Sequence, residues 1–219
     1  MSEPLRLVIW RHGQTDWNVF NRFQGHSDIP LNMVGEYQVT HAAKILSAMN
    51  PSRIISSDLG RAKQTAQALV ELTKVNLEID PDLRETNGGH WEGRTDDENR
   101  AQDGVRFTKW ISGEDIRAGE IGETRSEVAT RARRAIDRVL AKENSGTFVF
   151  VTHGGAARCL LGSILNLPYE KWTTLGGLSN ACWSVLEPNH HVDRGWTLVE
   201  HNAGSVSYTH LTLPTIYSV

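Results

Sequence analysis

Two histidine–glycine pairs stand directly after apolar runs of the sequence, and they are the residues with the clearest capacity for chemistry. His12-Gly13 follows the run at 7–10, and His153-Gly154 follows the run at 147–151. Short apolar runs that end near glycine are typical of buried strands leading into a tight loop or a helix. If the two strands are parallel neighbours, their carboxyl ends lie at the same edge of the sheet, so we expect both imidazoles there. Ligands of open α/β sheets bind at this edge.

Two arginines are expected beside these histidines. Arg11 precedes His12, and Arg61 falls in the first turn of the helix predicted after the strand at 53–56, so it faces the same edge. Two guanidinium groups and two imidazoles suit a dianionic phosphate better than a carboxylate. Neither a serine nor a cysteine is placed there as a nucleophile for carbonyl chemistry. The pattern therefore predicts a phosphate site.

A carboxylate completes the predicted chemistry. Glu85 lies at the start of a long polar segment, and Glu92 is a near alternative. Cleavage of a phosphate ester needs a proton for the leaving oxygen, and a positioned acid contributes about 10²–10⁴-fold. We therefore predict Glu85 as the general acid.

The elements that must position these residues alternate between strands and helices. Short β-branched or apolar runs predict strands at 7–10, 53–56, 77–79 and 147–151, and residues 181–186 and 196–200 alternate like a late pair. The run at 147–151 has the composition of a central buried strand.

Helices are predicted between these strands. Asn32 and Asp58 are expected to cap the first two, Thr124 and Glu127 form a capping box for the third, and a fourth is expected over 156–165. The order predicts an α/β fold of three αβα layers, with a mainly parallel sheet and helices on both faces.

The segment at 94–123 interrupts this alternation. It is polar and shows little periodicity, and such segments are usually functional lids or disordered. We expect a lid insertion that contacts the group attached to the phosphate, within one domain over 1–204. Residues 205–219 contain no Asp, Glu, Lys or Arg and resemble translated adapter sequence, so we predict a foreign or disordered tail.

Bulk composition limits the partners. The 219 residues carry a formal charge of −3 and two cysteines, so neither nucleic-acid binding nor a disulfide framework is expected. No leader and no long apolar run is present, which predicts a cytoplasmic protein without a membrane partner. The arginines of the third helix are expected on a solvated face; they are Arg131, Arg133, Arg134 and Arg138.

Taken together, the motifs resemble those of the histidine phosphatase superfamily, in its phosphoglycerate-mutase-like branch. They lie at 11–15 with Asn18, at 56–66, at 84–93 and at 152–155, and the resemblance covers about residues 5–202. It identifies residues 1–204 as a histidine phosphatase domain. The segments 175–183 and 196–202 also look similar to actinobacterial glucosyl-3-phosphoglycerate phosphatases.

The resemblance implies a phosphomonoesterase that acts on small phosphorylated metabolites through a phosphohistidine on His12. The catalytic residues it implies are His12, Glu85, Arg11, Arg61 and His153. The phosphate-binding residues it implies are Arg11, His12, Asn18, Gln24, Arg61, His153 and Gly154. No metal or cofactor is expected, because the cationic side chains stabilise the transferring charge.

Two alternatives to hydrolysis stay open. One is a phosphoglycerate mutase, although the segment at 94–124 lacks the arginine- and proline-rich insertion expected of such enzymes. The other is a catalytically idle phospho-ligand-binding module. The histidines lack the spacing of a zinc site, and the oligomeric state is not predicted.

Overall fold

The computed structural model describes residues 4–189, 191 and 195–204. Its described part contains a six-stranded sheet in the order β3-β2-β4-β1-β5-β6. The strands are β1 (Arg6–Arg11), β2 (Pro51–Ser56), β3 (Leu77–Ile79), β4 (Thr147–Thr152), β5 (Trp183–Asn189) and β6 (Gly195–Ala203). The first four run parallel, whereas β5 pairs antiparallel with β1 and β6 pairs antiparallel with β5. The prediction of an α/β fold with a mainly parallel sheet is confirmed.

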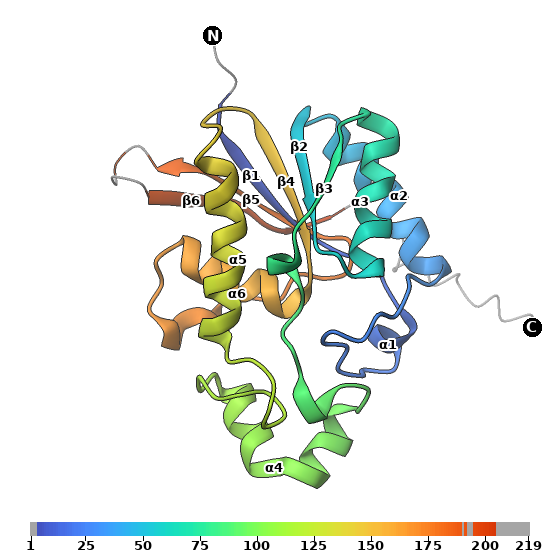
Figure 1. Cartoon of the computed structure of the whole chain (residues 1–219), viewed down its shortest axis with the longest axis vertical. Helices are drawn as coiled ribbons and strands as arrows, with labels where there is room; N and C mark the ends of the chain where they lie inside the picture. Colours follow the sequence, from blue (N-terminus) through green and yellow to red (C-terminus); the bar gives the residue numbers. More distant parts are fainter. Residues whose placement is uncertain (1–3, 190, 192–194, 205–219) are drawn as a thin grey trace, which may run out of the picture.

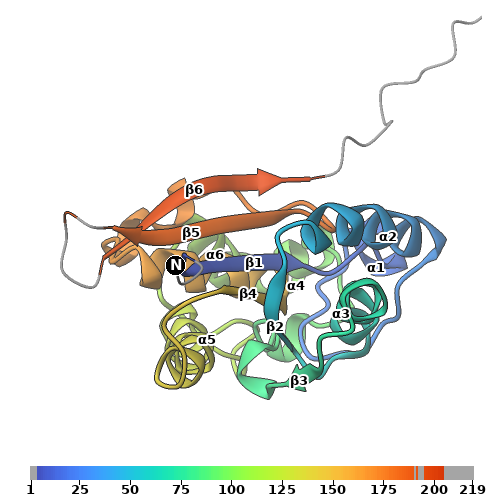
Figure 2. The same cartoon turned by 90° about the horizontal axis from the view of Figure 1, so that it is seen from above.

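Helices cover both faces of this sheet (Figures 1 and 2). The helices α2 (Met33–Ser47) and α3 (Gly60–Thr73) pack on one face, and α5 (Arg125–Leu140) and α6 (Gly154–Ile164) pack on the other. Alternate residues of β1 serve the two cores, because successive strand side chains point to opposite faces. Val8 and Trp10 join the α2–α3 core, whereas Leu7 and Ile9 join the α5–α6 core.

The helix caps only partly follow the prediction. Asn32 accepts a hydrogen bond from the Gly35 amide, and Thr124 forms the predicted capping box of α5. The predicted cap at Asp58 is wrong. The cap residue of α3 is Leu59, and the Asp58 carboxylate instead binds the Arg84 guanidinium through both oxygens.

The 94–123 segment contains a helix that the sequence analysis did not predict. Helix α4 (Asp96–Ser112) starts with a capping box between Thr95 and Glu98 and departs from helical geometry at Asp103. Its apolar residues are few and show only a weak helical period, which is why the sequence pattern did not reveal this helix. Its Phe107 packs with Trp91 and Ala118 in a small separate cluster, and the helix lies at the far end of the molecule from β3 and β6 (Figure 1).

Short helical turns complete the chain. They are α1 (Asp16–Val19), η1 (Pro81–Leu83), η2 (Gly89–Trp91) and η3 (Tyr169–Thr174). Among the described residues, no helix is both long and apolar enough to cross a membrane. The predicted tail at 205–219 lies outside the described residues.

Candidate active site

The two predicted histidines meet where β1 and β4 end. The His12 amide donates to the Thr152 carbonyl and extends the β1–β4 pairing by one residue. The imidazole centroids of His12 and His153 lie 5.1 Å apart, and both side chains are buried. Parallel strand pairing therefore places both rings at one sheet edge.

The hydrogen bonding of His12 defines its tautomer. Its Nδ1 lies 2.7 Å from the Gly13 carbonyl oxygen, which can only accept, so Nδ1 carries the proton. Burial, followed by the charges of Arg61 and Arg11, holds the pKa of His12 well below 6.5. The ring is therefore neutral near neutral pH, and Nε2 keeps the free electron pair that a nucleophile needs.

His153 has the opposite tautomer. Its Nδ1 accepts from the Arg61 Nε at 3.2 Å, so Nε2 carries the proton and donates to the Ser57 Oγ at 2.9 Å. Burial, with the charges of Arg61 and His12, also holds its pKa well below 6.5. Both nitrogens of His153 are thus bound to protein groups. Sequence reasoning gave no role to Ser57, although it stands directly after β2.

The two arginines differ in how they are held. The buried Arg61 guanidinium donates to the carbonyls of Ser27 and Gly25 at 2.7 and 2.8 Å. Arg11 donates from Nη1 to the Leu178 carbonyl at 2.6 Å, and its buried Nε has no partner among the described residues. Burial lowers the pKa of both guanidinium groups, and the charge of Glu85 partly opposes this shift. Arg11 therefore has an unused donor that suits an anion.

Asn18 presents a donor to the same space. Its Oδ1 accepts from the Thr15 backbone and hydroxyl and from the Asn180 side-chain amide. The side-chain nitrogen of Asn18, Nδ2, is therefore the group left to donate to a ligand. Asn180 also donates to the His12 carbonyl at 3.2 Å. Asn180 thus links Asn18 to the backbone of His12, and the sequence analysis gave it no role because it comes from the loop before β5.

Gln24 and Gly154 have different relations to the site. Gln24 is 8% exposed and borders the cavity, and its Oε1 has no partner in the described part of the chain. A Cβ at Gly154 would lie 3.2 Å from the Arg11 guanidinium carbon. Glycine at this position therefore lets α6 approach Arg11 closely.

The Glu85 carboxylate lies at the start of α6. Its carboxylate accepts from the backbone amides of Gly155 at 3.0 Å and Ala156 at 2.8 Å, and from that of Thr86 at 2.8 Å. Helix N-termini favour negative charge, so α6 orients this carboxylate. The alternative, Glu92, instead accepts from the amides of a loop and does not border the cavity.

These groups surround a cavity of about 190 Å³. It is lined by Arg11, His12, Asn18, Arg22, Phe23, Gln24, Gly25, Arg61, Glu85, Thr86, Trp110 and Gly155. His153 lies behind this wall rather than on it. The aromatic side chains of Phe23 and Trp110 border the cavity and lie 5.6 Å apart between centroids.

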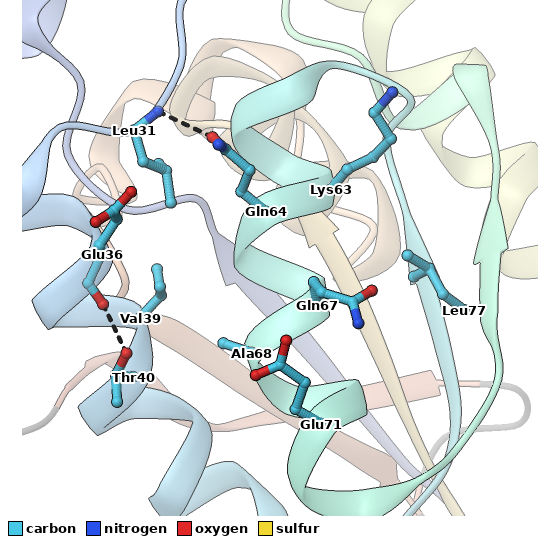
Figure 3. Close-up of a pocket in the computed structure, with 10 residues that line it drawn as sticks. All are labelled: Leu31, Glu36, Val39, Thr40, Lys63, Gln64, Gln67, Ala68, Glu71 and Leu77. Carbon is cyan, nitrogen blue, oxygen red and sulfur yellow. Dashed lines mark hydrogen bonds between the residues drawn. The ribbon is translucent and has the colours of Figure 1, made fainter.

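A roomier hollow of about 610 Å³ lies between α2 and α3 (Figure 3). It is lined by two carboxylates, Glu36 and Glu71, and by the single cation Lys63. This lining opposes binding of a dianionic phosphate. Within the described ranges, no group of three or more His, Cys, Asp or Glu side chains is arranged to hold a metal ion.

The sequence matches the family described as histidine phosphatase superfamily (branch 1) over residues 7–204. The chain belongs to this superfamily. A glucosyl-3-phosphoglycerate phosphatase of Mycobacterium tuberculosis (strain H37Rv) is 39% identical over 83% of this chain and 84% of that protein. A probable phosphoglycerate mutase of Serratia proteamaculans is 33% identical over 97% of each chain.

Solved structures agree with the family assignment. The mycobacterial glucosyl-3-phosphoglycerate phosphatase complexed with VO3 superposes with a TM-score of 0.84 and 39% identity, over 91% of this chain and 99% of the other. A structure described as Bacillus stearothermophilus YhfR superposes equally well at 27% identity, over 92% of this chain and 98% of the other. The prediction that this histidine phosphatase is a phosphoric monoester hydrolase is confirmed.

Proposed function

We propose that the enzyme hydrolyses small phosphate monoesters through a phosphohistidine on Nε2 of His12. The free electron pair on this nitrogen, at a cavity also lined by Arg11 and Arg61, is the observation that carries the proposal. The nitrogen attacks phosphorus, the ester P–O bond breaks, and protonated Glu85 gives its proton to the leaving oxygen. Glu85 then takes a proton from water, which attacks the phosphohistidine and releases inorganic phosphate.

The surrounding groups stabilise the transferring phosphoryl group. The free Nε of Arg11, the buried Arg61 and the amide nitrogen of Asn18 supply donors fixed before the substrate arrives. His153 orients Arg61 by accepting from its Nε. These side chains supply the charge stabilisation without a bound metal ion.

We further propose a sugar phosphoglycerate, of the glucosyl-3-phosphoglycerate class, as the substrate. The relatives named as glucosyl-3-phosphoglycerate phosphatases support this choice. The cavity supports it too, because Phe23 and Trp110 offer apolar faces, whereas Gln24 and Arg22 offer polar groups for hydroxyl and carboxylate oxygens. Location in the cytoplasm remains a prediction from the sequence.

The first experiment measures hydrolysis of p-nitrophenyl phosphate in the presence of EDTA. We expect activity in the wild type, none in His12→Ala, and full activity in His41→Ala, whose ring lies on α2 outside the cavity lining. Acid-labile phosphate should be trapped on the wild type and be absent in His12→Ala. Loss of wild-type activity with EDTA would contradict the metal-free mechanism.

A phosphoglycerate mutase is the second candidate, since relatives are named as probable mutases. A panel of phosphometabolites that includes glucosyl-3-phosphoglycerate separates the candidates. Release of inorganic phosphate supports the phosphatase. Interconversion of phosphoglycerates with a bisphosphate primer, without phosphate release, supports the mutase. Binding of phosphate esters without turnover would support the idle module.

A further inference from the structure

The backbone that carries Glu85 has no regular secondary structure of its own. Residues 84–88 form neither helix nor strand. The Glu85 carboxylate is held by the first amides of α6, but this contact does not fix the main chain from which the side chain starts. The exact place of the carboxylate therefore depends on what holds that backbone.

Arg131 of α5 binds this backbone through its guanidinium group. Its Nη1 donates to the carbonyls of Asp82 and Arg84 at 2.8 and 2.6 Å, and its Nη2 donates to the Glu85 carbonyl at 2.8 Å. The remaining two donors go to the Glu123 carboxylate at 2.7 and 2.8 Å. All five N–H groups are used, and the side chain is 11% exposed. The expectation that Arg131 lies on a solvated face is therefore wrong.

Glu123 binds both Arg131 and the backbone that follows Glu85. Its Oε2 also accepts from the Asn87 amide at 2.8 Å, so one carboxylate joins Arg131 to the backbone two residues after Glu85. Burial alone would raise the pKa of Glu123, but its hydrogen bond and ion pair with Arg131 outweigh burial and lower it. His26 adds a hydrogen bond from Nε2 to the Glu85 carbonyl at 2.9 Å.

We propose that Arg131, anchored by Glu123, is a positioning residue that holds Glu85 at the distance needed for proton transfer. The proposal rests on the proposed role of Glu85 as the acid. Helix α5 then fixes the backbone of Glu85 while α6 fixes its carboxylate, and the two helices pack on one another through Val128 and Ala156. Lysine cannot replace this contact, because one ammonium group with three donors cannot span three carbonyls and a carboxylate.

The test compares two esters in Arg131→Met and in the matched control Arg133→Met. Arg133 lies on the same helix and, among the described residues, its side chain pairs with Asp137 of that helix alone. A glycerol phosphate needs a proton on its leaving oxygen, whereas p-nitrophenyl phosphate releases a stable anion. Glu85 also activates water in the second step, which both esters share, so the comparison uses kcat/KM, which reports the transfer of the phosphoryl group to His12. Because a misplacement of about 1 Å costs about 10²-fold, we expect Arg131→Met to lower kcat/KM on the glycerol phosphate about that much and kcat/KM on p-nitrophenyl phosphate far less. Arg133→Met should match the wild type on both esters.

An equal loss of kcat/KM on both esters would overturn the proposal, and so would a lower melting temperature with kcat/KM unchanged on both. If Arg131→Met does not fold, Glu123→Gln gives the same comparison, with a smaller selective loss expected because one carboxamide oxygen still accepts. Arg131→Lys should recover only part of the activity on the glycerol phosphate. An inactive wild type would count against the proposed function. An active wild type whose variants lose activity equally on both esters would count only against the positioning role of Arg131.

Discussion

Two neutral histidines buried at the active site should make the free enzyme unusually sensitive to mild acid. His12 and His153 both have pKa values held well below 6.5, first by burial and then by the charge of Arg61. In the unfolded chain each would titrate near 6.5, so below that pH the unfolded state binds protons that the folded state does not. Stability therefore falls with falling pH, and the slope approaches about 1.4 kcal/mol per pH unit for each histidine well below pH 6.5.

The predicted loss is large enough to measure. Between about pH 7.5 and pH 5.5 the pair should lower the free energy of unfolding by up to about 2.7 kcal/mol, a sizeable part of the roughly 5–15 kcal/mol that stabilises a typical domain. The loss continues as pH falls, until the folded-state pKa values are reached. Because the pKa of folded His12 lies well below 6.5, its nucleophilicity should decline at a lower pH than that of a free imidazole.

Urea unfolding of the phosphate-free enzyme at the two pH values provides the assay. On going to the lower pH, the free energy of unfolding of the wild type should fall by up to about 2.7 kcal/mol more than that of the double variant His12→Asn/His153→Asn. Each single variant should remove about half of this difference. His41→Gln serves as the control, because its ring lies on the surface of α2 and its removal should leave the difference unchanged. An equal loss in the wild type and the double variant would refute the argument that these two rings are held neutral.

Three further predictions concern single contacts. Gly155→Ala should selectively lower kcat/KM on alkyl phosphates, because the new Cβ would lie 2.7 Å from a Glu85 carboxylate oxygen; an unchanged ratio of kcat/KM between alkyl and aryl phosphates would contradict the placement of the acid. Asp58→Ala removes the part-exposed pair with Arg84 and should cost less than about 1 kcal/mol in urea unfolding, with activity retained; a larger cost would show that the pair does more than a surface ion pair. Thr124→Ala removes the capping oxygen of α5 and should cost about 1 kcal/mol, and no change in the unfolding midpoint would mean that the cap does not stabilise the helix.

The local features of the chain were predictable because they depend on residues close together in sequence. Apolar runs that end at His12 and His153 predict strands and the edge at which their imidazoles meet. The capping residues Asn32 and Thr124 mark where α2 and α5 begin. A second capping box, at Thr95, marked α4 as well, but the weak hydrophobic period of that helix hid it.

The sequence by itself determined the order of the strands and of the helices that cover the sheet, and the residue types at the sheet edge, since each follows from short-range pattern. Only the tertiary structure decided how their polar atoms are paired. The His153 tautomer depends on Ser57 and Arg61, and the backbone of Glu85 is held by a hydrogen bond from Arg131. The apolar neighbours of Arg131 on α5, Val128 and Ala132, hinted at burial. Its partners are backbone carbonyls about fifty residues away, and their convergence depends on packing, which no local pattern records.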